Sequence, residues 1–169
     1  LTLMARFDGH KALEIMQRDR VTVFEGVPTM YAAMLNDPRG GETDTSTLQV
    51  CVSGGAALPV EIMRAFEEKF GCQILEAYGL SETSPLAASN PREAERKPGS
   101  IGLPIDGVEM RVVDDHGSEM PQGDVGEVTI RGHNVMKGYW KQDQATAKAI
   151  DDAGWFRTGD LARVDEDGY

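Results

Sequence analysis

The sequence has no excess of positive charge and no long apolar run. Its 28 Asp and Glu outnumber 17 Lys and Arg, which gives a formal net charge of −11 at neutral pH. Basic residues form no cluster along the chain, so neither nucleic acid nor an anionic membrane is expected as the main partner. No apolar stretch is long enough to cross a bilayer, and no secretory signal is evident. We therefore expect a cytoplasmic protein, with peripheral attachment to a membrane left open.

Cysteine and histidine are also scarce. Cys51 and Cys72 lie in apolar surroundings without metal-ligand spacing, and we interpret them as reduced core residues. The three histidines, His10, His116 and His133, fall at a helix start, a turn and a loop. They provide no Ser-His-Asp set, and they are best explained as solvated polar residues.

Several motifs of known enzyme classes are missing. Residues 79–83 lack the second glycine of the G-x-S-x-G elbow, and residues 53–57 do not match the G-x-G-x-x-G dinucleotide fingerprint. No G-x-x-x-x-G-K-[ST] sequence occurs. A serine hydrolase, a Rossmann dehydrogenase and a P-loop enzyme are therefore not indicated.

Strand and helix patterns alternate in the first part of the chain. Helices are predicted over His10–Arg18 with Asp8 as cap, over Thr29–Leu35, and after Pro59 up to Gly71; strands are predicted over Val21–Phe24, Leu48–Val52 and Gln73–Tyr78. Such alternation is typical of a mostly parallel sheet with flanking helices, in the α/β class.

A charged connector, Asn90–Pro98, separates this part from a second one in which strands dominate. Strands are predicted over Val108–Val113, Gly126–Arg131 and Trp155–Val164, with a short helix over Asp143–Ile150 that Asp143 caps. We expect this part to form a β-rich, barrel-like subdomain.

Two glycine-containing loops follow strands that one helix separates. Ser53-Gly54-Gly55 follows the strand that ends at Val52, and Tyr78-Gly79-Leu80-Ser81-Glu82 ends the next strand. A βαβ unit places such loops side by side, where open α/β sheets bind ligands. Tyr78 could stack on a base, Ser81 could donate to a phosphate oxygen, and Glu82 is a ligand type that Mg²⁺ accepts. The simpler alternative is that Ser-Glu-Thr only forms a turn or caps a helix.

The third stretch of interest is Trp155-Phe156-Arg157-Thr158-Gly159-Asp160-Leu161. An ionised Asp is an acceptor with two oxygens, so Asp160 could bind both hydroxyls of a ribose. Taken alone, Asp160 is more simply explained as a turn residue. Together the three stretches indicate a nucleotide site.

Several ordered motifs resemble those of the adenylate-forming superfamily, which includes acyl-CoA synthetases, peptide-synthetase adenylation domains and beetle luciferases. Residues 78–83 resemble its Y-G-x-[ST]-E-[TS] motif, and residues 155–161 resemble W-[FL]-x-T-G-D-[LI]. Residues 126–132 with 136–140 resemble the segment G-E-[IL]-x-[IV]-[RK]-G…M-x-G-Y. Val27-Pro28-Thr29 and Ser53-Gly54-Gly55-Ala56 also occur in the family's order.

The resemblance implies a two-step reaction that uses ATP, Mg²⁺ and coenzyme A. A carboxylate would attack the α-phosphate of ATP, and a thiol would then take the acyl group. By the same resemblance, Glu82 is the Mg²⁺ ligand, Ser81 the hydroxyl near the phosphates, and Asp160 the ribose ligand. The remaining predicted residues are Glu76, Ala77, Tyr78, Gly79 and Leu80 along the adenine and phosphate side, and Gly54, Gly55 and Ala56 between adenine and acyl pocket.

The resemblance also predicts how the chain is divided. Residues 1–97 would belong to the α/β subdomain of an AMP-binding domain, and residues 98–169 to a β-rich subdomain that carries the Thr-Gly-Asp ribose motif. The family's phosphate loop would precede Leu1, and its C-terminal domain with the adenylation Lys would follow Tyr169. We therefore expect a piece of a longer enzyme, inactive in isolation.

Within the superfamily, residues 100–104 and 134–140 are most similar to bacterial fatty-acyl-CoA ligases. We expect a long- or medium-chain fatty acid as substrate, with an aryl acid as the alternative. A non-catalytic nucleotide-binding relative and an α/β domain with purely structural motifs are the competing interpretations. The expected partners are small molecules, with oligomerisation left open.

Overall fold

The chain forms two compact units. The structure, a computed structural model, describes all residues from Leu1 to Tyr169. The first unit contains Leu1–Ala77 and Pro91–Ser100, and the second contains Tyr78–Asn90 and Ile101–Tyr169. The expected division at residues 97 and 98 concerns the family's subdomains and stays a prediction.

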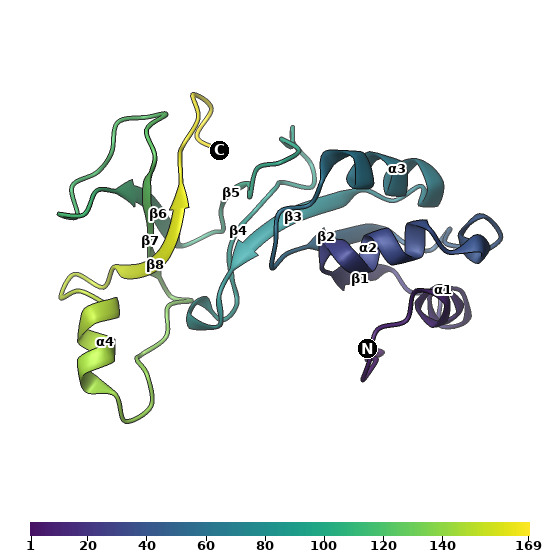
Figure 1. Ribbon diagram of the computed structural model, residues 1–169, viewed down its shortest axis with the longest axis horizontal. Coiled ribbons are helices and arrows are strands. Elements are labelled where there is room, and N and C mark those ends of the chain that lie inside the picture. The colour runs from purple at the N-terminus through teal and green to yellow at the C-terminus, as the bar shows by residue number, and fades with distance from the viewer. The chain divides into compact units, whose positions relative to one another are not determined.

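The first unit is built on a parallel sheet with helices between its strands (Figure 1). Val23 pairs with Val50 in parallel register, and Cys51 pairs with Ile74. The elements are α1 (Gly9–Arg18), β1 (Val23–Gly26), α2 (Pro28–Leu35), the 3₁₀ turn η1 (Pro38–Gly41), β2 (Val50–Ser53), α3 (Val60–Phe70) and β3 (Ile74–Gly79). The last strand continues into the second unit, since the division falls after Ala77.

The core of the first unit is apolar and rich in aromatic rings. Tyr31 of α2 and Phe66 of α3 are both fully buried, and their rings meet edge to face with centroids 5.0 Å apart. Phe66 also contacts Phe70 at 4.4 Å. The one polar atom of Tyr31 is satisfied, because its hydroxyl donates to the carbonyl of Val52 at 2.6 Å. Cys51 and Cys72 are buried and free, as the sequence predicted.

Arg96 fixes the connector between the two predicted parts to α3 and β3. Arg96 donates to both carboxylate oxygens of Glu67, at 2.6 and 2.7 Å, and to the carbonyl of Ile74 at 2.6 Å. Gly99, three residues later, donates its N–H to Glu76 at 2.7 Å. The connector, which its composition predicts only as a charged linker, therefore packs against α3 and β3.

The second unit is mainly antiparallel. Its elements are the 3₁₀ turn η2 (Ser81–Thr83), β4 (Leu86–Ser89), β5 (Leu103–Pro104), β6 (Val108–Val113), β7 (Gly126–Gly132), α4 (Asp143–Ala149) and β8 (Phe156–Ala162). β6, β7 and β8 form a three-stranded sheet around a small apolar core that includes Val108, Val128 and Ile130.

The predicted fold class is confirmed. The first sheet has the strand order β1-β2-β3-β4-β5 with parallel pairing of β1 to β2 and β2 to β3, and the β-rich part follows as a separate antiparallel sheet. This second sheet is open, not a closed barrel. The sequence did not predict β4 and β5. The prediction that Asp143 caps α4 was wrong, because Asp143 is the first helical residue and Gln142 precedes it without a capping bond.

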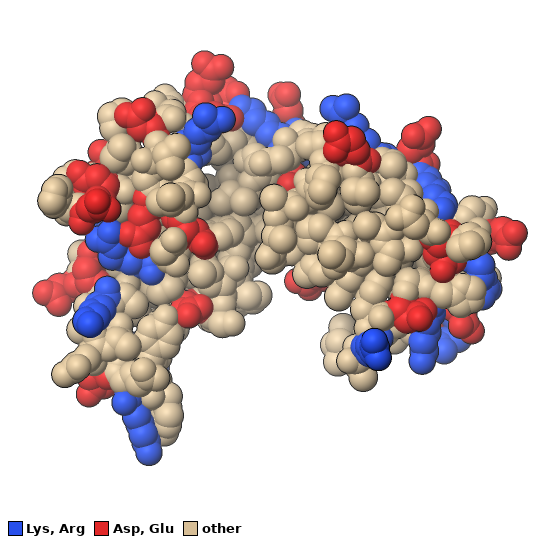
Figure 2. Space-filling model, in the orientation of Figure 1, with Lys and Arg blue, Asp and Glu red and all other residues tan.

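The surface carries charges of both signs. Figure 2 shows acidic side chains spread over the visible face with basic ones between them, and no field of basic residues. No helix is long and apolar enough to cross a membrane.

Candidate functional site

The end of β3 turns sharply into η2, and the turn requires glycine. A Cβ placed on Gly79 would fall on the carbonyl oxygen of Pro85, so the backbone can approach this closely only without a side chain. Thr83, fully buried, accepts from the N–H of Leu80 at 2.9 Å and donates to the carbonyl of Pro85 at 2.7 Å. These bonds fix the backbone of residues 80–85, from which the side chains of Ser81 and Glu82 extend.

Ser81 and Glu82 occupy this turn, in positions suited to a ligand. Ser81 is exposed, and its hydroxyl makes no hydrogen bond within the chain. Glu82 is half-buried, and its Oε1 accepts from the hydroxyl of Tyr139 at 3.0 Å. The carbonyl of Glu82 accepts from the N–H of Met136 at 2.8 Å. Segment 136–139 therefore supports the turn and orients the carboxylate of Glu82.

The Tyr139–Glu82 contact also has an electrostatic signature. The pKa of the Tyr139 phenol is raised, first by its hydrogen bond to Glu82 and then by burial. The phenol therefore acts as a donor to Glu82 at neutral pH. The sequence missed this partner, although Tyr139 stands in the M-x-G-Y part of a motif that the resemblance had identified.

Asp160 lies beside Tyr78, as the nucleotide-site hypothesis requires. The hydroxyl of Tyr78 donates to Oδ2 of Asp160 at 2.5 Å. The pKa of Tyr78 is raised, mainly by burial and further by its bond to the Asp160 carboxylate. Asp160 is exposed, and its second oxygen, Oδ1, accepts from no group of the chain. Two residues 82 positions apart thus place an aromatic ring and a carboxylate next to each other.

The predicted residues of the first unit gather at the ends of β2 and β3. The N–H of Gly54 donates to the carbonyl of Gly26 at 3.2 Å, and a Cβ on Gly54 would lie 3.4 Å from the carbonyl oxygen of Ala77. Gly55 and Ala56 follow in an exposed loop. The loop after β2 therefore runs along the end of β3, as the βαβ argument predicted.

Glu76 is the buried carboxylate of this group. It pairs with Ser53 in the parallel register and is 7% exposed. Burial raises its pKa, although the N–H of Gly99 offsets part of that shift. The hydroxyl of Ser53, 2% exposed, has no hydrogen-bond partner within the chain. An unpaired buried hydroxyl is costly, so its presence at the end of β2 marks this position as unusual.

The second unit thus brings together Tyr78, Gly79, Leu80, Ser81, Glu82 and Asp160, and the first unit brings together Gly54, Gly55, Ala56, Glu76 and Ala77. No group of three or more His, Cys, Asp or Glu side chains could hold a metal ion. On the turn after β3, the available donor is the carboxylate of Glu82. One carboxylate fits Mg²⁺, which keeps several waters and shares phosphate oxygens of its substrate.

The arrangement suits a phosphorylated sugar with a flat base. A free hydroxyl and a carboxylate on one turn can serve a phosphate and its counter-ion. An aromatic ring next to an exposed carboxylate can serve a base and the adjoining ribose hydroxyls.

A comparison with protein families gives a match to AMP-binding enzymes over residues 1–140. Among curated proteins, the chain is 38% identical over 170 residues to a long-chain-fatty-acid–CoA ligase of Bacillus subtilis, covering 100% of this chain and 30% of that protein. It is also 38% identical over 169 residues to a feruloyl-CoA synthase of an Amycolatopsis species, covering 99% and 34%. The chain therefore spans about a third of the length of these relatives.

The fold is shared with solved structures. ATP-bound MatB from Rhodopseudomonas palustris has a TM-score of 0.89 and 41% sequence identity, with 99% of this chain and 33% of that chain covered. At this identity the likeness extends beyond the arrangement of strands and helices.

Proposed function

This chain belongs to the family of AMP-binding enzymes, and we propose that its full-length protein joins a carboxylic acid to coenzyme A with ATP. In the first step, a carboxylate oxygen of the acid attacks the α-phosphorus of ATP and pyrophosphate leaves. In the second step, the sulfur of coenzyme A attacks the acyl carbon. The acyl–phosphate bond breaks, AMP leaves, and the thiol proton is lost to a base.

The observation that carries the proposal is the pair formed by Tyr78 and Asp160. An aromatic ring hydrogen-bonded at 2.5 Å to an exposed carboxylate offers one face for adenine and one acceptor for the ribose. In this proposal Asp160 accepts from ribose hydroxyls and orients the nucleotide. The same Tyr78 hydroxyl occupies one oxygen of Asp160 and leaves the other for the ligand.

Ser81 and Glu82 would act on the phosphate side. The free hydroxyl of Ser81 would donate to a phosphate oxygen, and Glu82 would hold Mg²⁺ with the oxygen that Tyr139 does not engage. When bound, Mg²⁺ neutralises negative charge on the phosphates. Gly54, Gly55 and Ala56 would lie between the adenine and the acyl group, since backbone without bulky side chains lets flat groups approach.

We propose a fatty acid as the substrate, in the cytoplasm, because segments 100–104 and 134–140 are most similar to fatty-acyl-CoA ligases. The relatives support two substrate classes, since one is named for long-chain fatty acids and another for the feruloyl group. An aryl acid is therefore the second candidate. A relative that binds nucleotide without catalysis is the third.

A pyrophosphate-exchange screen of the full-length protein tests these candidates. The enzyme would be incubated with ATP, Mg²⁺ and labelled pyrophosphate over fatty, aryl and amino acids, and acyl-CoA would be measured with coenzyme A added. We expect exchange that depends on fatty acids and yields their thioesters. Exchange with aryl acids alone would favour the second candidate. ATP binding without exchange on any acid would favour the non-catalytic relative.

A further inference from the structure

The strand that carries Asp160 is irregular at that residue and the two before it. In the pairing of β7 with β8, Thr129 lies opposite Arg157, but Glu127 lies opposite Leu161. Between these pairs, Val128 faces three residues of β8 at positions 158–160. The extra residues bulge out of the ladder, which leaves backbone N–H groups without their regular partners.

Side chains replace the missing ladder bonds. The N–H of Gly159 donates to Oε1 of Glu127 at 3.0 Å. The N–H of Asp160 donates to the hydroxyl of Thr158 at 3.1 Å, and that hydroxyl donates to the carbonyl of Val128 at 2.8 Å. Gly159 adopts a positive φ of 78°, which other residues rarely accept, so the bulge has one defined shape.

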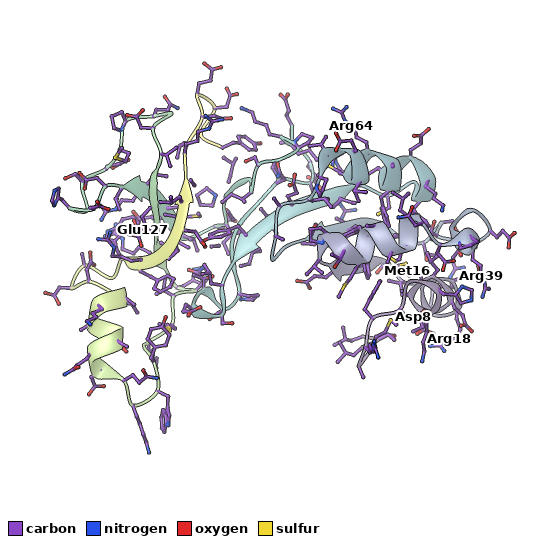
Figure 3. The ribbon with its side chains drawn as sticks, in the orientation of Figure 1. Asp8, Met16, Arg18, Arg39, Arg64 and Glu127 are labelled. Carbon is purple, nitrogen blue, oxygen red and sulfur yellow. The ribbon has the colours of Figure 1, made fainter.

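The second carboxylate oxygen of Glu127 binds Arg157, the residue that precedes the bulge. Oε2 accepts from Nε of Arg157 at 2.8 Å and from Nη2 of the same guanidinium. Figure 3 marks Glu127, which lies on β7 opposite Leu161 of β8. One carboxylate therefore links the residue before the bulge to a backbone N–H inside it. A charge-assisted, two-nitrogen contact is both strong and directional.

We propose that Glu127 is a positioning residue for nucleotide binding, which fixes the Thr158-Gly159-Asp160 bulge so that Asp160 meets the ribose. The inference rests on the proposed function, because Asp160 must be the ribose ligand. Glu127 itself touches no substrate. It acts through the N–H of Gly159, which is the residue next to Asp160.

The same sheet contains a matched control. Glu109 on β6 accepts from Nε and Nη2 of Arg131 on β7, at 3.0 and 2.8 Å. This pair also joins neighbouring strands with two hydrogen bonds, but the β6–β7 register is regular from Val108 to Val113. Glu109 accepts from no backbone N–H. If the Glu127–Arg157 pair only joined neighbouring strands, substitution of neither Glu127 nor Glu109 would change KM for ATP or the preference for ATP over 2′,3′-dideoxy-ATP.

The experiment compares full-length Glu127→Gln, Glu109→Gln and Asp160→Ala with the wild type, in pyrophosphate exchange with ATP and with 2′,3′-dideoxy-ATP. Gln keeps the shape of Glu but loses the charge that holds Arg157. We expect Glu127→Gln to raise KM for ATP about 5- to 20-fold with kcat within about 3-fold, because the ribose contact contributes similarly to ground and transition states. Its preference for ATP over the dideoxy analogue should shrink by the same factor.

Glu109→Gln should leave KM and the preference unchanged. Thr158→Val, which removes the other brace of the bulge and keeps the Glu127–Arg157 pair, should shift KM in the same direction by a smaller factor. If Glu127→Gln folds poorly, Arg157→Lys, which removes the two-nitrogen contact with Glu127 but keeps the positive charge, should raise KM in its place.

An unchanged KM in a folded Glu127→Gln, or an equal rise in Glu109→Gln, would overturn the positioning role while Asp160→Ala still loses the ribose preference. If Asp160→Ala keeps that preference, the ribose assignment fails, and the role of Glu127 fails with it.

Discussion

The two compact units of this chain are stabilised in different ways. The buried set of the first unit is almost entirely apolar and includes a series of contacting rings at Tyr31, Phe66 and Phe70. The second unit has a smaller apolar core, and its key backbone turns are fixed by polar side chains such as Thr83 and Glu127. A close-packed core tolerates little change in side-chain volume, whereas hydrogen bonds fix the orientation of the groups that they join. We therefore expect substitutions in the first unit to change stability, and those in the second to change binding and rate.

The largest effect should come from Phe66→Ala. Phe66 is completely buried between two other rings, so truncation leaves a cavity and should lower the free energy of unfolding by about 3–5 kcal/mol. Arg64→Ala is the control on the same helix, because Arg64 extends outward from α3 (Figure 3) and should change stability by less than about 0.5 kcal/mol. Chemical denaturation measures both. A loss below about 1 kcal/mol for Phe66→Ala would mean that the first unit does not depend on this packing.

Glu82→Gln should show the largest effect on chemistry. If Glu82 holds Mg²⁺ in the full-length protein as proposed, the substitution removes a charged ligand near the phosphates, and the exchange rate should fall by about 10²–10³. Glu119→Gln, an exposed carboxylate elsewhere in the second unit, should leave the rate unchanged. Pyrophosphate exchange at saturating Mg²⁺ measures both, and equal rates for wild type and Glu82→Gln would remove Glu82 from the site.

Tyr139→Phe should have an intermediate effect. The substitution keeps the ring but deletes the donor to Glu82 Oε1, which is a hydrogen bond to a charged group. We expect a higher Mg²⁺ concentration for half-maximal exchange, with the unfolding midpoint little changed. A shifted midpoint with unchanged Mg²⁺ dependence would assign Tyr139 to the fold alone.

Glu109→Gln should have the smallest effect, and it should depend on pH. The bond from Arg131 lowers the pKa of Glu109 below its ordinary value of 4.5. The folded state therefore favours the carboxylate, so its contribution to stability is present above about 4.5 and is lost as pH falls through the lowered pKa. The difference in thermal midpoint between wild type and variant should be small at pH 7 and vanish under acid conditions. A difference that grows on acidification would contradict this sign.

Local patterns predicted most helices and strands, for identifiable reasons. α1 begins where the carboxylate of Asp8 accepts from the N–H of Lys11 at 2.8 Å, and β6 was predicted with its observed bounds, Val108–Val113, because turns flank a clear strand pattern. β4 was missed because Leu86–Ser89 is short and has no β-branched residue. β5 was missed because a two-residue strand has no period to detect.

The sequence named candidate site residues, whose roles stay predictions, but it did not indicate the contacts that support them. Resemblance identified Ser81, Glu82 and Asp160 without reference to geometry. The bond between Tyr78 and Asp160 joins residues far apart in the sequence, and nothing local indicates it. The contact of Glu127 with Gly159 depends on a shift in strand register, which no single-strand pattern contains.

The bulge in β8 also constrains the length of the chain. Three residues of β8 stand opposite one of β7, so the excess is two, an even number. Side chains alternate between sheet faces with a period of two, so an even excess returns the strand to its original parity. Phe156 before the bulge, buried opposite Ile130, and the residues after it therefore keep the faces they would have in a regular ladder. Removing two residues here would erase the Thr158-Gly159-Asp160 bulge yet preserve the pairing of the sheet, whereas removing one would turn the side chains of one half of the strand to the opposite face.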